Sequence, residues 1–253
     1  MLNEQTLDQM NSLGLKGMAA WAALQANAAA AHSLSTAEWV GLAVDAEAQD
    51  RAQRKRERML KQAKLRQPDA CLEGLDYTVS RGLDRSIIAG LSNCAWIHAY
   101  QHVVVSGHTG TGKSYVACAL AQQAVRMGLS AVFKRFPRML EEMEVARADG
   151  SLPKYRHQLA RAKLLVLDDW AVAPITVRGR QDLLEVVEDR CDTGSLLITS
   201  QLPVDQWHDY LGDPSLADAI LDRILHRAHR IDLRGESMRK LRSSLQEVSY
   251  ENT

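Results

Sequence analysis

The stretch VVVSGHTGTGKSYVACALAQQAVRM, residues 103–127, decides the fold of this chain. Three successive valines at its start, Val103 to Val105, favour a short buried strand, and the glycines that follow favour a tight turn. After Lys113 the apolar residues recur at helical spacing. The stretch therefore predicts a strand, a glycine loop and a helix, in that order.

The loop between strand and helix matches the pattern G-x-x-x-x-G-K-S. Glycines let the backbone curl until several N–H groups point inward, and the new helix adds the positive end of its dipole, so the loop predicts a phosphate site. We expect Lys113, on an exposed loop, to meet the β- and γ-phosphates, and Ser114 to bind Mg²⁺. The alternative is a flexible loop with an incidental lysine. The predicted ATP-binding residues are Gly107, His108, Thr109, Gly110, Thr111, Gly112, Lys113, Ser114 and Tyr115.

Two later strand ends carry polar residues that fit the same site. Asp168 follows four apolar residues in KLLVLDDW, where a carboxylate can hold Mg²⁺ beside Ser114, and Asp169 is the candidate to orient or deprotonate a water. The segment SLLITSQ ends in three polar residues, any of which could help to place that water. Spacing does not distinguish Thr199, Ser200 and Gln201, of which Gln201 is the catalytic candidate.

The charge of the chain is balanced but segregated. It has 253 residues with 31 Lys and Arg against 31 Asp and Glu, yet residues 51–66 hold eight basic residues and one Glu. With acidic partners nearly absent from this run, one helical face is predicted to contact DNA phosphates. A solvated helix face is the alternative. The candidate DNA-binding residues are Arg51, Arg54, Lys55, Arg58 and Lys61, supplemented by Lys134, Arg135 and Arg138.

The pattern divides the chain at about residue 67. Residues 1–67 predict a small helical domain, in which a capping box at Ser35–Glu38 opens a long helix that Pro68 ends. Residues 68–253 alternate strand and helix, which predicts a parallel α/β sheet with ligands at the carboxyl ends of its strands. No zinc or disulfide spacing, signal peptide or long apolar run is present, so a reduced, cytoplasmic protein without membrane contact is expected.

Several motifs together resemble those of the IstB-like ATPases, relatives of the DnaC helicase loaders in the AAA+ superfamily. They are VVVSGHTGTGKS, LLVLDDW, LLITSQLP and AILDRILHRAHRIDLRGESMRK, with the basic helical N-terminus. The resemblance implies an ATP- and Mg²⁺-dependent regulatory ATPase of bacterial insertion-sequence transposition. Such a protein acts with an IstA-like transposase, binds double-stranded DNA with little sequence preference and forms a homo-oligomer with ATP.

The resemblance also implies roles for particular residues. Gly107–Ser114 is the Walker A site, Asp168 with Asp169 is the Walker B pair, and the TSQ segment is the sensor 1 region. Arg223 stands where relatives of the DnaA type place an arginine finger, with a structural arginine on an apolar helix as the alternative. Arg239 is a weaker candidate for a second sensor. The Walker B motif ends in Asp-Asp rather than Asp-Glu, which affects the rate of hydrolysis more than nucleotide binding. The implied fold is a P-loop AAA+ domain with a reduced C-terminal lid behind a small all-helical domain.

Other functions remain as alternatives. A DnaC-like replicative helicase loader would share these motifs but would act on a helicase. A metabolite kinase would need a mobile lid over its acceptor, whereas this chain has a basic helical segment instead. A scaffold that binds ATP and barely hydrolyses it would fit the Asp-Asp motif.

Overall fold

The structure of the chain is a computed structural model, which describes residues 4–25, 34–238 and 240. It divides into two compact units, Met1–Arg58 and Met59–Thr253, which are described separately below. The division falls inside a long helix, nine residues before the boundary expected from composition. Its position follows from the packing of Met59 and Ala63, which are buried in the core of the second unit.

The first unit contains α1 (Glu4–Ser12), α2 (Lys16–Gln25) and most of α3 (Thr36–Ala63). The carboxylate of Glu47 on α3 accepts hydrogen bonds from the N–H groups of Gly17 (2.8 Å) and Met18 (3.2 Å) at the start of α2. Donation from the Arg51 guanidinium lowers the pKa of Glu47. Because a negative carboxylate is attracted to the positive end of the helix dipole, Glu47 stabilises the contact between α2 and α3.

The capping box at the start of α3 is confirmed. The Ser35 Oγ accepts from the Glu38 N–H (3.3 Å), and the Glu38 carboxylate accepts from the Ser35 N–H (2.8 Å). The predicted end of the helix at Pro68 is wrong, since α3 ends at Ala63. Lys64 takes a positive φ of 51°, which stops the helical path before proline can act.

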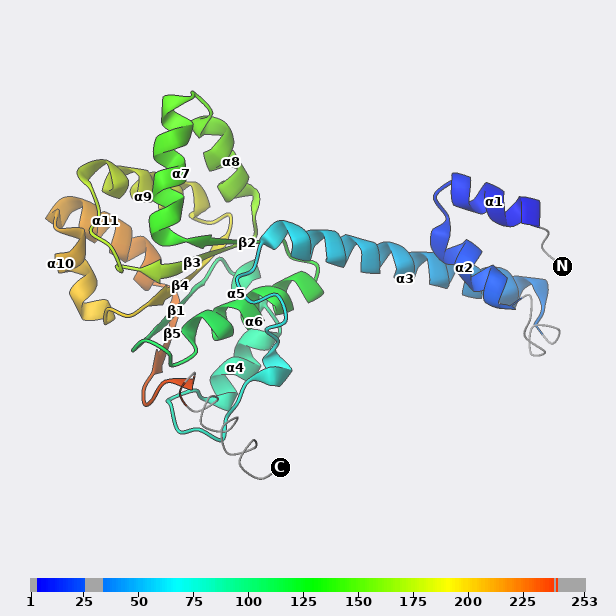
Figure 1. The fold of residues 1–253 in the computed structure, drawn as a ribbon, viewed down its shortest axis with the longest axis horizontal. Coiled ribbons are helices and arrows are strands. Elements are labelled where there is room, and N and C mark those ends of the chain that lie inside the picture. The colour runs from blue at the N-terminus through cyan, green and yellow to red at the C-terminus, as the bar shows by residue number, and fades with distance from the viewer. Residues whose placement is uncertain (1–3, 26–33, 239, 241–253) are drawn as a thin grey trace. The chain divides into compact units, whose positions relative to one another are not determined.

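The second unit contains a five-stranded sheet in which every neighbouring pair is parallel, in the order β2-β3-β4-β1-β5 (Figure 1). The strands are β1 (His102–Gly107), β2 (Ala131–Arg135), β3 (Leu164–Trp170), β4 (Ser195–Ser200) and β5 (Ala228–Leu233). The predicted parallel α/β architecture is confirmed. The carboxyl ends of β1, β3 and β4, which are neighbours in the sheet, therefore lie at one edge.

Helices connect the strands and lie on both faces of the sheet. They are η2 (Leu72–Gly74), α4 (Arg85–Ser92), α5 (Ala95–His98), α6 (Lys113–Arg126), α7 (Phe136–Ala148), α8 (Leu152–Arg161), α9 (Val177–Arg190), η3 (Val204–Gln206), α10 (Trp207–Leu211) and α11 (Pro214–Leu225). The helices α4 and α5 are separate, because Cys94 has a φ of 57° and the Asn93 side chain accepts from the Ala95 N–H. The short α10 was not expected.

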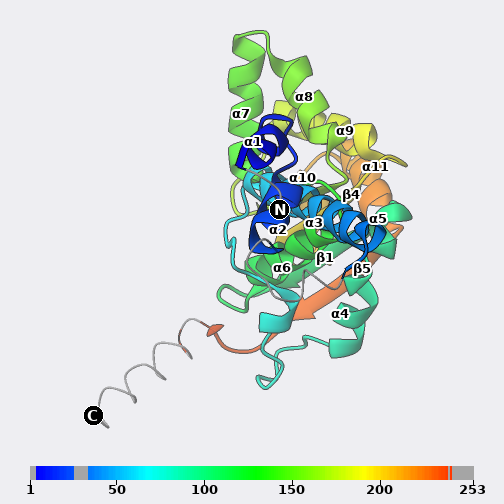
Figure 2. The ribbon, with the colours of Figure 1, turned by 90° about the vertical axis from the view of Figure 1, so that its right-hand side faces the viewer.

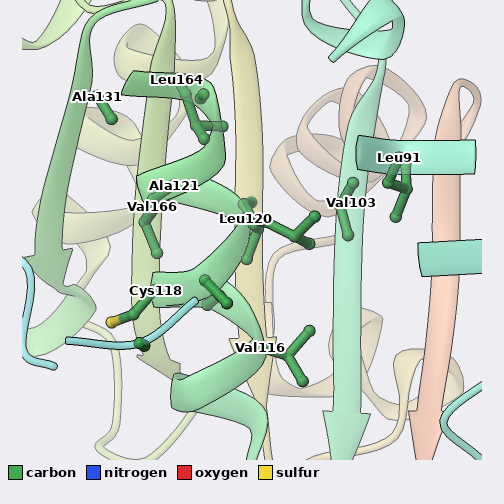
Figure 3. Close-up of a cluster of buried hydrophobic side chains, with 14 of the residues drawn as sticks. Leu91, Val103, Val116, Cys118, Leu120, Ala121, Ala131, Leu164 and Val166 are labelled. Carbon is green, nitrogen blue, oxygen red and sulfur yellow. The ribbon is translucent and has the colours of Figure 1, made fainter. Parts of the chain in front are cut away.

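Two apolar layers hold these helices to the sheet. On one face, Val103 and Val166 pack against Cys118 and Leu120 of α6 (Figure 3). On the other face, alternate strand residues such as Leu165 pack with α7, α9, α10 and α11. The turned view in Figure 2 shows α4 and α6 on one side of the strands and α7, α8 and α9 on the other. Burial of both faces explains why the central strands β1, β3 and β4 have apolar runs without alternation.

A bilayer-spanning element is not found among the helices that the structure describes, because none is both long enough and apolar enough.

Candidate functional site

The glycine loop turns sharply between β1 and α6. Gly107 has a φ of +143°, and a Cβ there would meet the carbonyl oxygen of Leu233 at 2.1 Å. Gly112 has a φ of +97°, and its Cβ would meet Nη1 of Arg81 at 2.4 Å. Both positions therefore require glycine. Because α6 begins directly after Gly112, its free N–H groups and positive dipole end face the loop.

Lys113 is buried, with 9% of its surface exposed, which corrects the expectation of an exposed loop lysine. As the first residue of α6, it directs its side chain back under the loop. Its Nζ donates to the carbonyl oxygens of Gly107 (2.7 Å) and His108 (2.8 Å). Burial lowers the pKa of Lys113, an effect opposed by the nearby carboxylates of Asp168 and Asp169. The loop thus encloses a cation that can pair with phosphate oxygens.

Three segments bring hydroxyl and carboxylate oxygens together beside Lys113. Oδ1 of Asp168, at the end of β3, accepts from the hydroxyls of Ser114 (2.8 Å) and Thr199 (2.6 Å). Asp168 is fully buried. Hard oxygen ligands of this kind suit Mg²⁺. No cluster of three or more His, Cys, Asp or Glu residues occurs in the described part of the chain.

Asp169 lies on a bend in β3. The register against β4 shifts between Leu167 and Trp170, and Asp169 takes a φ of 61°. Such a bulge re-aims side chains at a strand end. The Asp169 N–H donates to Thr199 Oγ1 (3.2 Å), while its Oδ2 accepts from Nε of Arg135 (2.9 Å). Thr199 therefore joins the two aspartates and the end of β4.

The three polar residues at the end of β4 have different surroundings. Thr199 contacts both aspartates, as described above. Ser200 is buried and donates to the carbonyl oxygens of Leu202 (2.8 Å) and Trp170 (3.3 Å), away from the loop. Gln201 is exposed, and its Oε1 accepts from the hydroxyl of Thr109 (2.6 Å). Gln201 thus contacts the glycine loop, Thr199 contacts the aspartate pair, and Ser200 contacts neither.

A cavity of about 300 Å³ lies over the loop, at the lower end of the range for small-molecule sites. The predicted residues that line it are Thr109, Gly110, Gly112, Lys113, Ser114, Tyr115, Asp169 and Gln201. Gly107, His108, Thr111 and Asp168 are not among the lining residues. The unpredicted lining residues are Arg66, Gln67, Gly74, Asp76, Arg81 and Met238. Residues outside the predicted motifs therefore form part of the site.

Arg81 is one of the residues that sequence reasoning missed. Its guanidinium is buried and donates from Nη1 to the carbonyl oxygen of Thr111 (2.8 Å) and from Nη2 to that of Asp76 (3.0 Å). It thereby ties the segment before α4 to the glycine loop. Arg81 belongs to no recognisable sequence motif, so its contact with the glycine loop is seen only in the folded structure.

The candidate arginine finger lies apart from the cavity. Arg223 on α11 donates to the carbonyl oxygen of Ala219 (2.8 Å) and to the carboxylate of Glu188 on α9 (3.0 Å). It is not among the residues that line the site. Arg239, the candidate second sensor, lies outside the described residues.

The basic face of α3 has more acidic partners than its sequence suggested. Arg51 pairs with Glu47 and Arg54 with Asp50, each at 2.6 Å and one helical turn apart. These carboxylates precede the basic run, so the expected lack of i,i+4 partners was wrong for both arginines. Three exposed residues of this face have no carboxylate partner among the described residues: Lys55, Arg58 and Lys61.

The supplementary basic residues near β2 are also paired. Lys134 forms an ion pair with Glu142, and Arg138 lies 3.7 Å from the same carboxylate group. Arg135 contacts Asp169 and so belongs to the cavity's surroundings rather than to a separate surface.

Comparison with known proteins agrees with this geometry. A family model described as "IstB-like ATP binding protein" matches residues 8–246. Two relatives carry names of the form "putative insertion sequence ATP-binding protein". One, from Sinorhizobium fredii, is 45% identical over 241 residues, which cover 95% of this chain and 98% of the relative. The other, of IS1162 in Pseudomonas fluorescens, is 44% identical over 203 residues, covering 80% and 88%.

Solved structures share the fold of much of this chain at low identity. DnaI superposes with a TM-score of 0.56 at 17% identity, covering 70% of this chain and 93% of that one. The DnaC helicase loader gives 0.51 at 15% identity, covering 65% and 97%. These likenesses confirm the predicted AAA+ P-loop fold. The family-model match over residues 8–246, together with the relatives of 45% and 44% identity, shows that the chain belongs to the family of IstB-like ATP binding proteins.

Proposed function

We propose that this chain is an ATP-dependent, DNA-binding regulatory ATPase of insertion-sequence transposition. In this proposal ATP and Mg²⁺ drive a homo-oligomer that binds double-stranded DNA and stimulates or targets an IstA-like transposase. The observation that carries it is the meeting of Ser114, Asp168 and Thr199 beside the buried cation of Lys113. Family membership and the names of the relatives support the ATP and the insertion-sequence parts.

Hydrolysis would use the residues around Asp168. Ser114 and Asp168 would hold Mg²⁺, which would neutralise charge that develops on the phosphates. Asp169 would orient the attacking water, and Gln201 would assist from the end of β4. Asp169 is one methylene shorter than the usual glutamate, and Arg135 already donates to it. Slow turnover is therefore part of the proposal.

DNA binding would use the exposed face of α3. Lysine and arginine on one helical face neutralise phosphates without reading bases, so affinity would depend little on sequence. The unpaired residues Lys55, Arg58 and Lys61 would contribute most, because Arg51 and Arg54 must first give up their carboxylate partners. ATP would tighten binding by joining several such faces in one oligomer.

Changing Lys55, Arg58 and Lys61 together to glutamine should lower DNA affinity in the presence of ATP. The slope of log affinity against log salt should fall by ~0.9 for each lost phosphate contact. Fluorescence anisotropy with one DNA duplex over a series of salt concentrations measures both quantities.

The control is a variant with three exposed cations of the second unit, Lys154, Arg161 and Arg178, changed to glutamine. An Arg51→Gln, Arg54→Gln pair should give an intermediate result. Equal slopes for the α3 variant and the control would show that the α3 face is only solvated.

We also propose that Arg223 acts on the nucleotide of a neighbouring subunit, since in its own subunit it does not line the cavity. An Arg223→Ala protein should bind ATP but hydrolyse it at least ten times more slowly, as expected for a lost transition-state cation. Mixing it with a Lys113→Ala protein should restore part of the activity. Phosphate release at several mixing ratios measures the rescue.

The Arg227→Ala variant is the control for this experiment, because Arg227 makes a similar exposed pair with Asp192 (3.5 Å). It should hydrolyse ATP at the normal rate. If no mixture of the Arg223→Ala and Lys113→Ala proteins recovers activity, Arg223 serves only to tie α11 to α9.

A helicase loader remains the alternative, but the likeness to the DnaC helicase loader concerns the fold alone. Stimulation of strand transfer by a transposase encoded with this protein would favour the proposal. Delivery of a replicative helicase to DNA would favour the alternative.

A further inference from the structure

Arg66 joins the aspartate pair to the end of α3. Its Nη1 lies 3.0 Å from Oδ2 of Asp168 and 3.4 Å from Oδ2 of Asp169. Arg66 lines the cavity, and its side chain is 41% exposed, whereas that of Asp168 is fully buried. A partly exposed guanidinium thus neutralises a buried carboxylate across 102 residues of sequence.

Both oxygens of Asp168 are engaged by protein groups. Oδ1 accepts from the hydroxyls of Ser114 and Thr199, and Oδ2 accepts from Arg66. A Mg²⁺ ion held by Ser114 and Asp168 would place a second cation on the same carboxylate. Arginine cannot lose its proton to relieve the repulsion. Arg66 and Mg²⁺ are therefore competitors for Asp168.

The position of Arg66 in the chain gives this competition a consequence. It stands three residues after Ala63, the last residue of α3, and Ala63 is fixed in the core of the second unit. Only residues 64–66 separate that anchor from the guanidinium, and Lys64 already has a positive φ. Release of Asp168 by Arg66 thus takes place either through rotation of the Arg66 side chain or through the short segment that follows the helix carrying the basic face.

We propose that Arg66 is a positioning residue that holds Asp168 until Mg²⁺–nucleotide displaces it, and that this displacement changes the segment 64–67 behind α3. Binding at the phosphate site is thereby coupled to the helix that precedes it. The inference rests on the proposed function, because it requires that the site bind Mg²⁺ with a nucleotide.

The first test is a Mg²⁺ titration of nucleotide binding, with the non-hydrolysable analogue AMPPCP as the probe. An Arg66→Gln protein should reach half-maximal binding at about tenfold lower Mg²⁺ concentration than wild type. The reason is that Mg²⁺ no longer competes with the charged hydrogen bond from Arg66 to Asp168. Arg66→Lys keeps the charge and should return the midpoint towards that of wild type. Affinity for AMPPCP in EDTA should not increase in either variant.

The Arg126→Gln protein is the matched control. Arg126 is 42% exposed and forms a 2.6 Å ion pair with Glu73 away from Asp168, so its loss should leave the midpoint unchanged. An unshifted midpoint in Arg66→Gln would overturn the inference. So would an equal loss of affinity at every Mg²⁺ concentration, which would make Arg66 a nucleotide ligand.

Hydrogen exchange on the wild-type protein gives a second test that needs no variant. Mg²⁺ with AMPPCP should raise exchange of the amides at 64–67, whereas AMPPCP in EDTA should not. No change at 64–67 while Mg²⁺–AMPPCP binds would overturn this inference and leave the proposed function intact. A wild-type protein that binds no nucleotide at any Mg²⁺ concentration would overturn both.

Discussion

Replacing Lys113 by alanine should lower ATP affinity about a hundredfold, the size expected when charged hydrogen bonds to a buried phosphate are lost. The Lys113 Nζ is held under the loop by the carbonyl oxygens of Gly107 and His108, so its charge is already in place for the ligand. Calorimetric titration with ATP and Mg²⁺ measures the loss. Wild-type affinity in this variant would refute the assignment of the phosphate site.

An Asp169→Asn protein is the comparison for this variant. Asp168 and Ser114 remain, so ATP and Mg²⁺ should bind with little change, while phosphate release should fall because the group that orients water is altered. Since Lys113 is buried, the melting temperature of each variant must also be recorded. A Lys113→Ala protein that melts near the wild-type temperature shows that the lost affinity is not caused by unfolding.

The second large effect is expected at Arg190, far from the nucleotide cavity. Its guanidinium is 1% exposed and donates to the carbonyl oxygens of Leu159 (2.8 Å), Ser195 (2.7 Å) and Lys163 (3.3 Å). Burial lowers the pKa of Arg190 to about 10, so the group stays charged at neutral pH. Arg190→Met would remove all three of these hydrogen bonds from the buried carbonyl groups, of which Lys163 keeps the Ser195 N–H (2.9 Å) and Leu159 the Ala162 N–H (3.4 Å). It should reduce the free energy of unfolding by about 4 kcal/mol.

Urea denaturation measures this loss, with Arg156→Met as the control. Arg156 makes ion pairs with Glu185 (2.7 Å) and Asp189 (2.9 Å) and is more exposed than Arg190. Exposed pairs contribute about 0–1 kcal/mol, so the control should change little. A similar change in both variants would mean that the three carbonyl groups find water when Arg190 is removed.

Local patterns in the sequence predicted the strands, the glycine loop and the two aspartates. A β-branched run, a Gly-Lys-Ser loop and an apolar helix face each depend on a few neighbouring residues, so the local sequence is enough to predict them. Arg66 and Arg81 were missed because their partners lie 102 and 30 residues away. The residues next to either arginine in the sequence do not indicate these contacts, which form only when the chain folds.

The basic face shows a smaller error of the same kind. Counting charges from residue 51 onward placed Glu47 and Asp50 outside the run, yet on a helix they lie one turn away from Arg51 and Arg54. The start of the helix was predicted correctly, whereas its end was placed too late and its net surface charge was overestimated. Charge on a helix must be counted over turns that extend beyond the run in both directions.

The Met238 N–H donates a hydrogen bond to the Gly110 carbonyl oxygen (2.9 Å). This contact determines which residues a nucleotide-binding fragment of the protein has to include. Met238 lines the cavity from beyond the last strand, and Arg66 lines it from before the first. A fragment of residues 82–233 would contain every strand of the sheet and the complete glycine loop. It would nevertheless lack Arg66 and Met238, because residues that precede β1 and follow β5 in the chain also line the cavity.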